Sequence, residues 1–143
     1  MSQEYDCLKL DNQLCFPLYV CAKEIVRRYH PFLEEIDLTY TQYITMMALW
    51  EHESMSVKAI GDLLHLDSGT LTPLLKKLEE KGLVVRARDP RDERVLIVTI
   101  TPEGETLKEK AKEVPFAMGS CLNISPEDGA ALKAMLEKLL KTF

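Results

Sequence analysis

The chain has 143 residues, of which 46% are hydrophobic and 29% charged, with 6 Gly and 7 Pro. Such a chain can bury a sizeable core as one domain, which excludes a disordered tail, a collagen-like rod and a disulfide-dense toxin. Its longest stretches without a charged side chain, 38–50 and 114–126, are too short to span a bilayer. The first residues, MSQEYD, lack the basic and apolar segments of a secretory signal. We therefore expect a cytoplasmic protein with reduced thiols and no membrane partner.

The overall charge argues at first against nucleic acid as a partner. The chain carries 18 Lys and Arg against 23 Asp and Glu, a formal net charge of −5, whereas nucleic-acid-binding domains are usually basic. Binding depends on the local field rather than on the sum of charges. Segment 76–94 holds more basic than acidic residues in this otherwise acidic chain, which makes it the candidate contact surface for an anionic partner.

Capping residues, prolines and apolar spacing predict a series of helices. The first has Asp11 or Asn12 as its cap, ends before Pro31, and should be kinked or delayed by Pro17. The second opens on a capping box that begins at Thr39. The predicted helices span about residues 12–29, 39–52, 57–65, 68–81, 102–114 and 126–140.

After Gly82 the apolar spacing changes from a helical to a strand period. Segments 83–88 and 94–100 are rich in apolar and β-branched residues, and they flank the charged segment 89–93. This pattern predicts a β-hairpin with a charged tip. The order of helix, short helix, tight turn, helix and basic hairpin is that of a winged helix-turn-helix. The sequence thus predicts one mainly α domain over 1–143 with a small β wing.

The second helix of such a pair enters the DNA major groove, where its first side chains meet base edges and later lysines meet phosphates. The hairpin tip can place an arginine in the adjacent minor groove, and a carboxylate on the same strand face would hold that arginine in one orientation. The pattern leaves open a fold of this kind that binds no DNA and has a merely solvated tip. The candidate DNA-binding residues are Ser68, Thr70, Leu71, Thr72, Lys76, Lys77, Arg86, Arg88, Arg91, Asp92 and Arg94.

A single winged helix-turn-helix module, or reading head, binds DNA weakly. Specific binders of this class place two such modules at half-sites about 34 Å apart. The winged helix-turn-helix occupies segment 39–100. The DNA-binding module does not require the helices outside it, at about 12–30 and 102–143. The last helix has a broad apolar stripe, which packs either on its own domain or on a second copy. We expect the second arrangement, an intertwined twofold homodimer.

The four cysteines differ in position. Cys15 lies near the start of the first predicted helix, where free backbone amides and the helix dipole stabilise a thiolate. Cys21 is interpreted as a core residue and Cys7 stays unassigned. Cys121 is either inert or, if the terminal helices share a dimer interface, a candidate resolving thiol for Cys15 of the other subunit. No Cys and His spacing typical of a metal site or a catalytic nucleophile is present, so we expect no metal, cofactor or catalytic residue.

Two motifs in particular carry a resemblance to a known family. The sequence NQLC over 12–15 and DSGTLTP over 67–73, together with residues 37–43, 49–53 and 92–94, resembles the organic-hydroperoxide-sensing (OhrR) branch of the MarR repressors. The resemblance extends over about residues 8–143. It implies a dimeric winged-helix repressor in which Cys15 is the peroxidatic cysteine and Tyr29 and Tyr40 hydrogen-bond its thiolate. By the same resemblance, Cys121 lies roughly where two-cysteine members carry a resolving cysteine.

The resemblance therefore predicts a repressor, not an enzyme. Its reduced dimer would bind a palindromic operator, and it would release the DNA when an organic hydroperoxide oxidises Cys15 to a sulfenic acid. Three alternatives stay open: a MarR-type repressor released by a small phenolic ligand, a thiol peroxidase, and an interaction module that does not bind DNA. Oxidative release reverses with a thiol reductant, whereas release by a ligand reverses on dilution.

Overall fold

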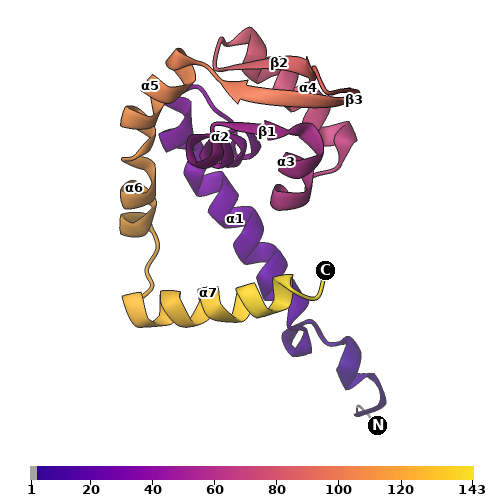
Figure 1. Cartoon of the computed structure of the whole chain (residues 1–143). Coiled ribbons are helices and arrows are strands. Elements are labelled where there is room, and N and C mark those ends of the chain that lie inside the picture. The colour runs from indigo at the N-terminus through magenta and orange to yellow at the C-terminus, as the bar shows by residue number, and fades with distance from the viewer. Residues whose placement is uncertain (1–2) are drawn as a thin grey trace.

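The computed structural model describes residues 3–143. Figure 1 shows one end of a long helix, α1, inside the folded part of the chain, while its other end and the N-terminal arm extend away from it. The prediction of a mainly helical chain with a small antiparallel sheet is confirmed. None of the helices within residues 3–143 is long and apolar enough to cross a bilayer. In chain order the elements are η1 (Gln3–Leu8), η2 (Leu10–Asn12), α1 (Cys15–Glu34), α2 (Tyr40–His52), β1 (Ser54–Ser56), α3 (Val57–Leu64), α4 (Ser68–Glu80), β2 (Val84–Asp89), β3 (Asp92–Ile100), α5 (Pro102–Ala111), α6 (Val114–Cys121) and α7 (Pro126–Leu140).

Helix α1 begins and ends later than the sequence predicts. Asp11 and Asn12 belong to the short 3-10 helix η2, and no side chain caps α1. The predicted end before Pro31 is wrong, because a proline in a helix costs one backbone hydrogen bond while Leu33, just beyond it, is buried in the core. Pro17 lies in the first turn, where its missing N–H has no intrahelical acceptor. It therefore delays the helix rather than kinking it.

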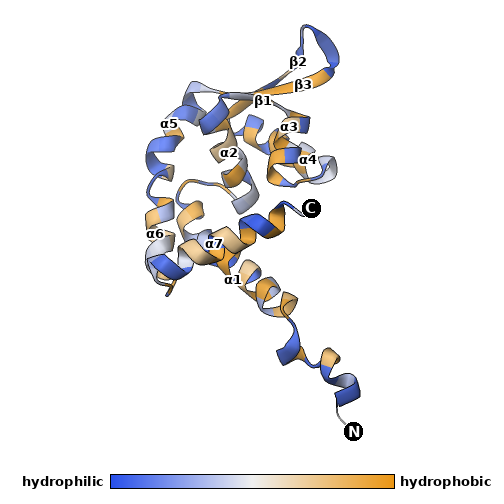
Figure 2. Ribbon diagram, turned by 60° about the horizontal axis from the view of Figure 1, so that its bottom comes forward, coloured by the Kyte–Doolittle hydropathy of each residue, from blue (hydrophilic) through white to orange (hydrophobic). Residues whose placement is uncertain are grey.

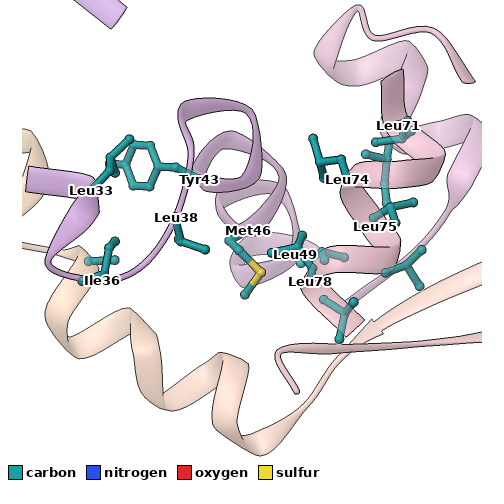
Figure 3. Close-up of a cluster of buried hydrophobic side chains, with 14 of the residues drawn as sticks. Leu33, Ile36, Leu38, Tyr43, Met46, Leu49, Leu71, Leu74, Leu75 and Leu78 are labelled. Atoms are coloured by element: carbon teal, nitrogen blue, oxygen red, sulfur yellow. The ribbon is translucent and has the colours of Figure 1, made fainter. Parts of the chain in front are cut away.

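The core lies between the end of α1, α2 and α4. Leucines at 71, 74, 75 and 78 form one buried face of α4, as their helical spacing predicts. Figure 3 shows this face turned toward Met46 and Leu49 of α2, with Leu33 and Tyr43 continuing the apolar cluster toward the end of α1. Because α4 is packed along this whole face, its opposite face is the one left to solvent.

The sheet contains one strand that the sequence did not predict. The hairpin of β2 and β3 is confirmed, with a shorter tip than the segment 89–93 that the charges indicated. Strand β1 pairs antiparallel with β3, in register Ser54 to Thr99, and gives the strand order β1-β3-β2. A strand this short has no readable alternation, so only its pairing with a distant strand defines it.

The C-terminal region contains one more helix than the sequence predicts. Thr101 and Ser125 cap α5 and α7 with their hydroxyls, as expected from the Pro residues that follow them. The helix predicted over 102–114 ends at Ala111, however, and α6 begins at Val114. Pro115 lies in the first turn of α6, the position where a proline starts a helix rather than continuing one.

Gly104 marks the closest approach of α5 to the wing, and it provides a stability test. A Cβ there would lie 2.3 Å from the carbonyl oxygen of Leu83 and 2.8 Å from Cγ1 of Ile100. We expect Gly104→Ala to lower the free energy of unfolding by about 3 kcal/mol, because backbone atoms must move to admit the methyl group. Urea unfolding followed by circular dichroism measures the change.

Gly129 in α7 is the matched control for Gly104, since nothing lies within 4 Å of the Cβ that would be added there. Gly129→Ala is expected to raise the free energy of unfolding by up to about 1 kcal/mol, because alanine has the higher helix propensity. Equal unfolding midpoints for the two variants would contradict the tight packing of α5 on the wing.

Candidate DNA interface and thiol site

The N-terminal end of α4 is presented to solvent by a tight turn. Ser56 caps α3, and His65 ends it in the left-handed conformation. Asp67, which the sequence did not identify as the cap, then accepts a hydrogen bond of 2.7 Å from the backbone N–H of Thr70. That hydrogen bond holds the pKa of the Asp67 carboxyl below its usual value. The cap fixes where the first turn of α4 starts, and with it the place of the hydroxyl side chains on that turn.

The predicted base-contacting and phosphate-contacting residues of α4 are exposed, with one exception. Leu71 retains only 1% of its accessible surface. The prediction that it touches a base is therefore wrong, because it begins the leucine face that packs into the core. The exposed candidates on α4 are Ser68, Thr70, Thr72, Lys76 and Lys77.

Asp92 holds Arg94 of the wing in one orientation, as predicted. Arg94 donates from Nε to Oδ1 of Asp92 at 3.0 Å and from Nη2 to Oδ2 at 3.1 Å. These hydrogen bonds lower the pKa of Asp92, and the Arg94 side chain remains 90% exposed. Arg88 and Arg91 are also exposed. The hairpin thus presents cations beside the exposed face of α4.

Arg86 differs from the other wing arginines because its charge is used inside the protein. Its side chain is only 22% exposed and lies 3.1 Å from Oε1 of Glu79 in α4. Its backbone N–H also donates to Oε2 of Glu79, at 2.8 Å, and both bonds lower the pKa of that carboxyl. Arg86 thus attaches β2 to α4, while its DNA contact stays a prediction.

The cysteines of the chain are unpaired and exposed. Cys15 is the first residue of α1, which has neither a side-chain cap nor an acidic residue in its first turn. Free N–H groups at a helix start favour a negative charge nearby. Cys21 is exposed as well, and its prediction as a core residue is wrong. The N-terminal half of α1 lies outside the core of its own chain (Figure 2).

Tyr29 and Tyr40 lie side by side, with ring centroids 5.0 Å apart. Tyr43, which the sequence did not assign to this group, completes the cluster at 5.9 Å from Tyr29. Burial raises the pKa of Tyr29, and the neighbouring Tyr40 raises it further; burial and the two neighbours also raise the pKa of Tyr43. The raised pKa keeps the hydroxyls of Tyr29 and Tyr43 protonated at neutral pH. The signal for Tyr43 was its spacing of three residues from Tyr40 on one helix.

Cys15 and the tyrosine cluster are far apart within one chain. Helix α1 runs without interruption from Cys15 past Tyr29, a separation of roughly 21 Å along its axis. Cys121 is the last residue of α6, and its carbonyl accepts a hydrogen bond of 3.2 Å from Nη1 of Arg28. The structure thus places Cys121 next to Arg28, the residue before Tyr29, while Cys15 lies at the other end of α1.

An open pocket of about 950 Å³ lies between α1, α2 and α4. Its wall includes Tyr40 from the tyrosine cluster and His30 from α1, and it continues to Lys77 and Lys81 at the far end of α4. The pocket therefore borders both the tyrosine cluster and the helix that carries the candidate DNA contacts.

The sequence and fold recur in known regulators of transcription. Residues 27–111 match the family described as "Transcriptional regulator SarA/Rot". The whole chain is 44% identical to the organic hydroperoxide resistance transcriptional regulator of Bacillus subtilis (strain 168), and covers 97% of it. The chain belongs to the MarR family, in its OhrR branch. The resemblance inferred from the motifs is confirmed.

Other relatives of this MarR-family chain are also regulators. SarZ of Staphylococcus aureus (strain USA300) is 46% identical over 121 residues, which cover 85% of the chain and 82% of SarZ. AbfR is a protein of Staphylococcus epidermidis, and the structure of its reduced form bound to DNA is similar to this chain. The two are 37% identical in sequence, with a TM-score of 0.82, and the match covers 99% of this chain and 96% of AbfR. For the disulfide-formed AbfR, at 35% identity and coverages of 97% and 98%, the TM-score is 0.67. The winged-helix fold of the OhrR-branch chain is thus confirmed.

Proposed function

We propose that the protein is a homodimeric transcriptional repressor that binds operator DNA while Cys15 is reduced and releases it when an organic hydroperoxide oxidises that thiol. The observation that carries the proposal is the placement of Cys15 and the tyrosines at opposite ends of one continuous helix. A twofold dimer with antiparallel α1 helices brings the start of each helix to the tyrosines of the other. The similarity to a hydroperoxide resistance regulator over the whole chain supports the same conclusion.

The exposed apolar surface supports a dimer built by about residues 12–30 and 102–143. Helix α7 has no buried residue, although its stripe of leucine and methionine side chains is broad. Figure 2 shows apolar residues along both α7 and the projecting part of α1. A second copy would bury both surfaces at once. The exposed apolar side chains are Leu14 just before α1, Phe16, Leu18, Tyr19 and Val26 on α1, and Leu132, Met135, Leu139 and Leu140 on α7.

In such a dimer the Cys15 thiolate accepts hydrogen bonds from the hydroxyls of the partner's Tyr29 and the partner's Tyr40. The thiolate attacks the O–O bond of the hydroperoxide; with one proton, this forms the sulfenic acid and an alcohol, and sulfur supplies the two electrons. The neutral sulfenic acid is a weaker acceptor than the thiolate. Oxidation thus weakens these hydrogen bonds and also adds an oxygen atom to the sulfur, which displaces the tyrosine hydroxyls from their places around the reduced residue.

Cys121 is the proposed resolving thiol. Its carbonyl is hydrogen-bonded to Arg28, the residue before Tyr29 on α1, and in the dimer the partner's Cys15 would approach this part of α1. Attack of the Cys121 thiolate on the sulfenic sulfur forms an intersubunit disulfide and releases water once the leaving hydroxide is protonated. A small cellular thiol would react in the same way where Cys121 does not.

Each reading head combines α4 and the wing. The hydroxyls of Ser68, Thr70 and Thr72 meet base edges in the major groove, and Lys76 and Lys77 meet phosphates. Arg88 and Arg91 supply further cations, and Arg94, oriented by Asp92, enters the adjacent minor groove. Two such heads bind half-sites about 34 Å apart, so a change at the dimer interface alters the match to the operator.

Arg94 provides a test of the wing contact. We expect Arg94→Ala to weaken binding of the reduced protein, and to reduce the slope of log K against log salt by about 0.9 for each protomer, because one phosphate-neutralising cation is lost. Titrations at several salt concentrations, followed by fluorescence anisotropy, measure both effects. An unchanged slope would show that the wing arginine does not approach the DNA.

The experiment that tests the function is a mobility shift with a duplex selected by the reduced protein from a random pool. tert-Butyl hydroperoxide should release the duplex, and dithiothreitol should restore binding. Release that reverses on dilution but not with dithiothreitol would favour the second candidate, a repressor controlled by a small phenolic ligand in the 950 Å³ pocket. Steady consumption of peroxide without DNA binding would instead favour a thiol peroxidase.

A further inference from the structure

The C-terminal end of α4 is joined to the region between α1 and α2 by one lysine. Lys81, the residue that ends α4, donates from Nζ to the carbonyl oxygen of Asp37, and lies 3.5 Å from the carboxylate of the same residue. It also donates to Oε1 of Gln42, at 3.3 Å. The Lys81 side chain keeps 29% of its surface exposed, with Nζ held against Asp37 and Gln42. The residue as a whole is exposed, like the lysines on α4.

Gln42 is part of the capping box that starts α2. The residue is only 4% exposed. Its Oε1 accepts a hydrogen bond of 3.1 Å from the backbone N–H of Thr39, and its backbone N–H donates to the Thr39 hydroxyl. The same oxygen therefore serves the start of α2 and the end of α4. Any rearrangement of this capping box changes the acceptor that Lys81 needs.

The tyrosine cluster includes the first residue of α2. Tyr40 begins the helix and Tyr43 lies one turn later, and Tyr29 contacts both of them from α1. A displacement of Tyr40 thus moves the turn that carries Gln42. Because α4 is a regular helix packed along its leucine face, a displacement at its Lys81 end also changes the direction of its DNA-facing end.

We propose that Lys81 is a positioning residue that couples the tyrosine cluster to the recognition helix α4. The inference rests on the proposed function, since oxidation of Cys15 is the event that changes how the tyrosines pack. The first turn of α2 then shifts, and Lys81 transmits the shift to α4 through Asp37 and Gln42. Lys81 itself does not touch the DNA or the reacting sulfur. Both sites act on one element, the arrangement of α2 against α4, as a coupling free energy requires.

The test compares DNA affinity before and after hydroperoxide treatment in Lys81→Met, which keeps the aliphatic stem and removes the donors. In the wild type we expect the ratio of the two affinities to lie in the range usual for coupled sites, about 5- to 150-fold. In Lys81→Met we expect the ratio to fall toward one although Cys15 is oxidised equally, as shown by dimedone labelling. Lys81→Arg, which retains donors at a similar reach, should restore most of the ratio.

Lys77→Met is the matched control, because Lys77 is exposed, lies one helical turn earlier on the same side of α4 and lines the same pocket as Lys81. Because Lys77 is a proposed phosphate contact, Lys77→Met should weaken DNA binding equally in both redox states. It should also lower the slope of log K against log salt by about 0.9 for each protomer. Lys81→Met should leave the slope of the reduced protein unchanged. A wild-type affinity ratio in Lys81→Met, or a loss of slope equal to that of Lys77→Met, would overturn the coupling role. Wild-type protein that keeps its DNA after Cys15 oxidation would instead contradict the proposed function itself.

Discussion

A Cys15→Ser variant is expected to hold its operator DNA at a hydroperoxide concentration that releases the wild-type protein. The serine hydroxyl occupies nearly the same space at the start of α1 and still hydrogen-bonds to tyrosine hydroxyls, but a hydroperoxide does not oxidise it. We expect its affinity for DNA to be the same with and without hydroperoxide, whereas that of the wild type falls. Fluorescence anisotropy with one labelled duplex measures both proteins under identical conditions.

Cys21→Ser is the matched control for that experiment. Cys21 is also exposed on α1, yet it lies away from the free N–H groups at the helix start. This variant should release DNA on oxidation as the wild type does. If Cys15→Ser also releases its DNA when hydroperoxide is added, the sensing thiol is a different one.

The second large effect is expected from charges placed in the apolar stripe of α7. In Met135→Glu combined with Leu139→Glu, two carboxylates replace side chains that a dimer would bury, so the subunits should separate. A monomer presents one reading head, and DNA affinity should fall by about 10²- to 10⁴-fold with the loss of the linked second contact. Light scattering after size-exclusion chromatography gives the mass, and anisotropy gives the affinity.

Ala130→Glu combined with Ala134→Glu adds the same charge at the same spacing on the opposite side of α7. Both alanines are exposed in the single chain, and they lie outside the apolar stripe by the helical period. This control should remain a dimer and bind DNA normally. A dimeric Met135→Glu and Leu139→Glu variant would show that α7 does not form the subunit contact.

The features that the sequence predicted well are those set by neighbouring residues. The capping box at Thr39, the Pro that follows Thr101 and the leucine spacing of α4 each act within a few residues, and each lies where predicted. Strand β1 and the end of α1 were missed because distant segments determine them. β1 exists only through its pairing with β3, and α1 continues through Pro31 because Leu33 reaches the core.

The same distinction applies to the candidate site. The sequence indicated the wing pair of Asp92 and Arg94 because two residues on one strand face are neighbours. The leucine spacing indicated that Leu71 belongs to the apolar face of α4, but its place in the first turn of the recognition helix also made it a candidate base contact, and the burial of that face excludes the second role. The sequence could not indicate the contact of Lys81 with Asp37, which joins residues 44 positions apart. Tyr29 and Tyr40 were paired in the sequence only through the family resemblance.

A single hydroperoxide titration under non-reducing conditions, in which the mass of the Cys15 peptide and the fraction of bound DNA are followed together, tests the redox mechanism most directly. We expect the sulfur of Cys15 to change first, as a sulfenic acid or as a disulfide with Cys121, and DNA to be lost in proportion. Loss of DNA while Cys15 stays reduced, or full oxidation of Cys15 with the DNA still bound, would contradict this mechanism.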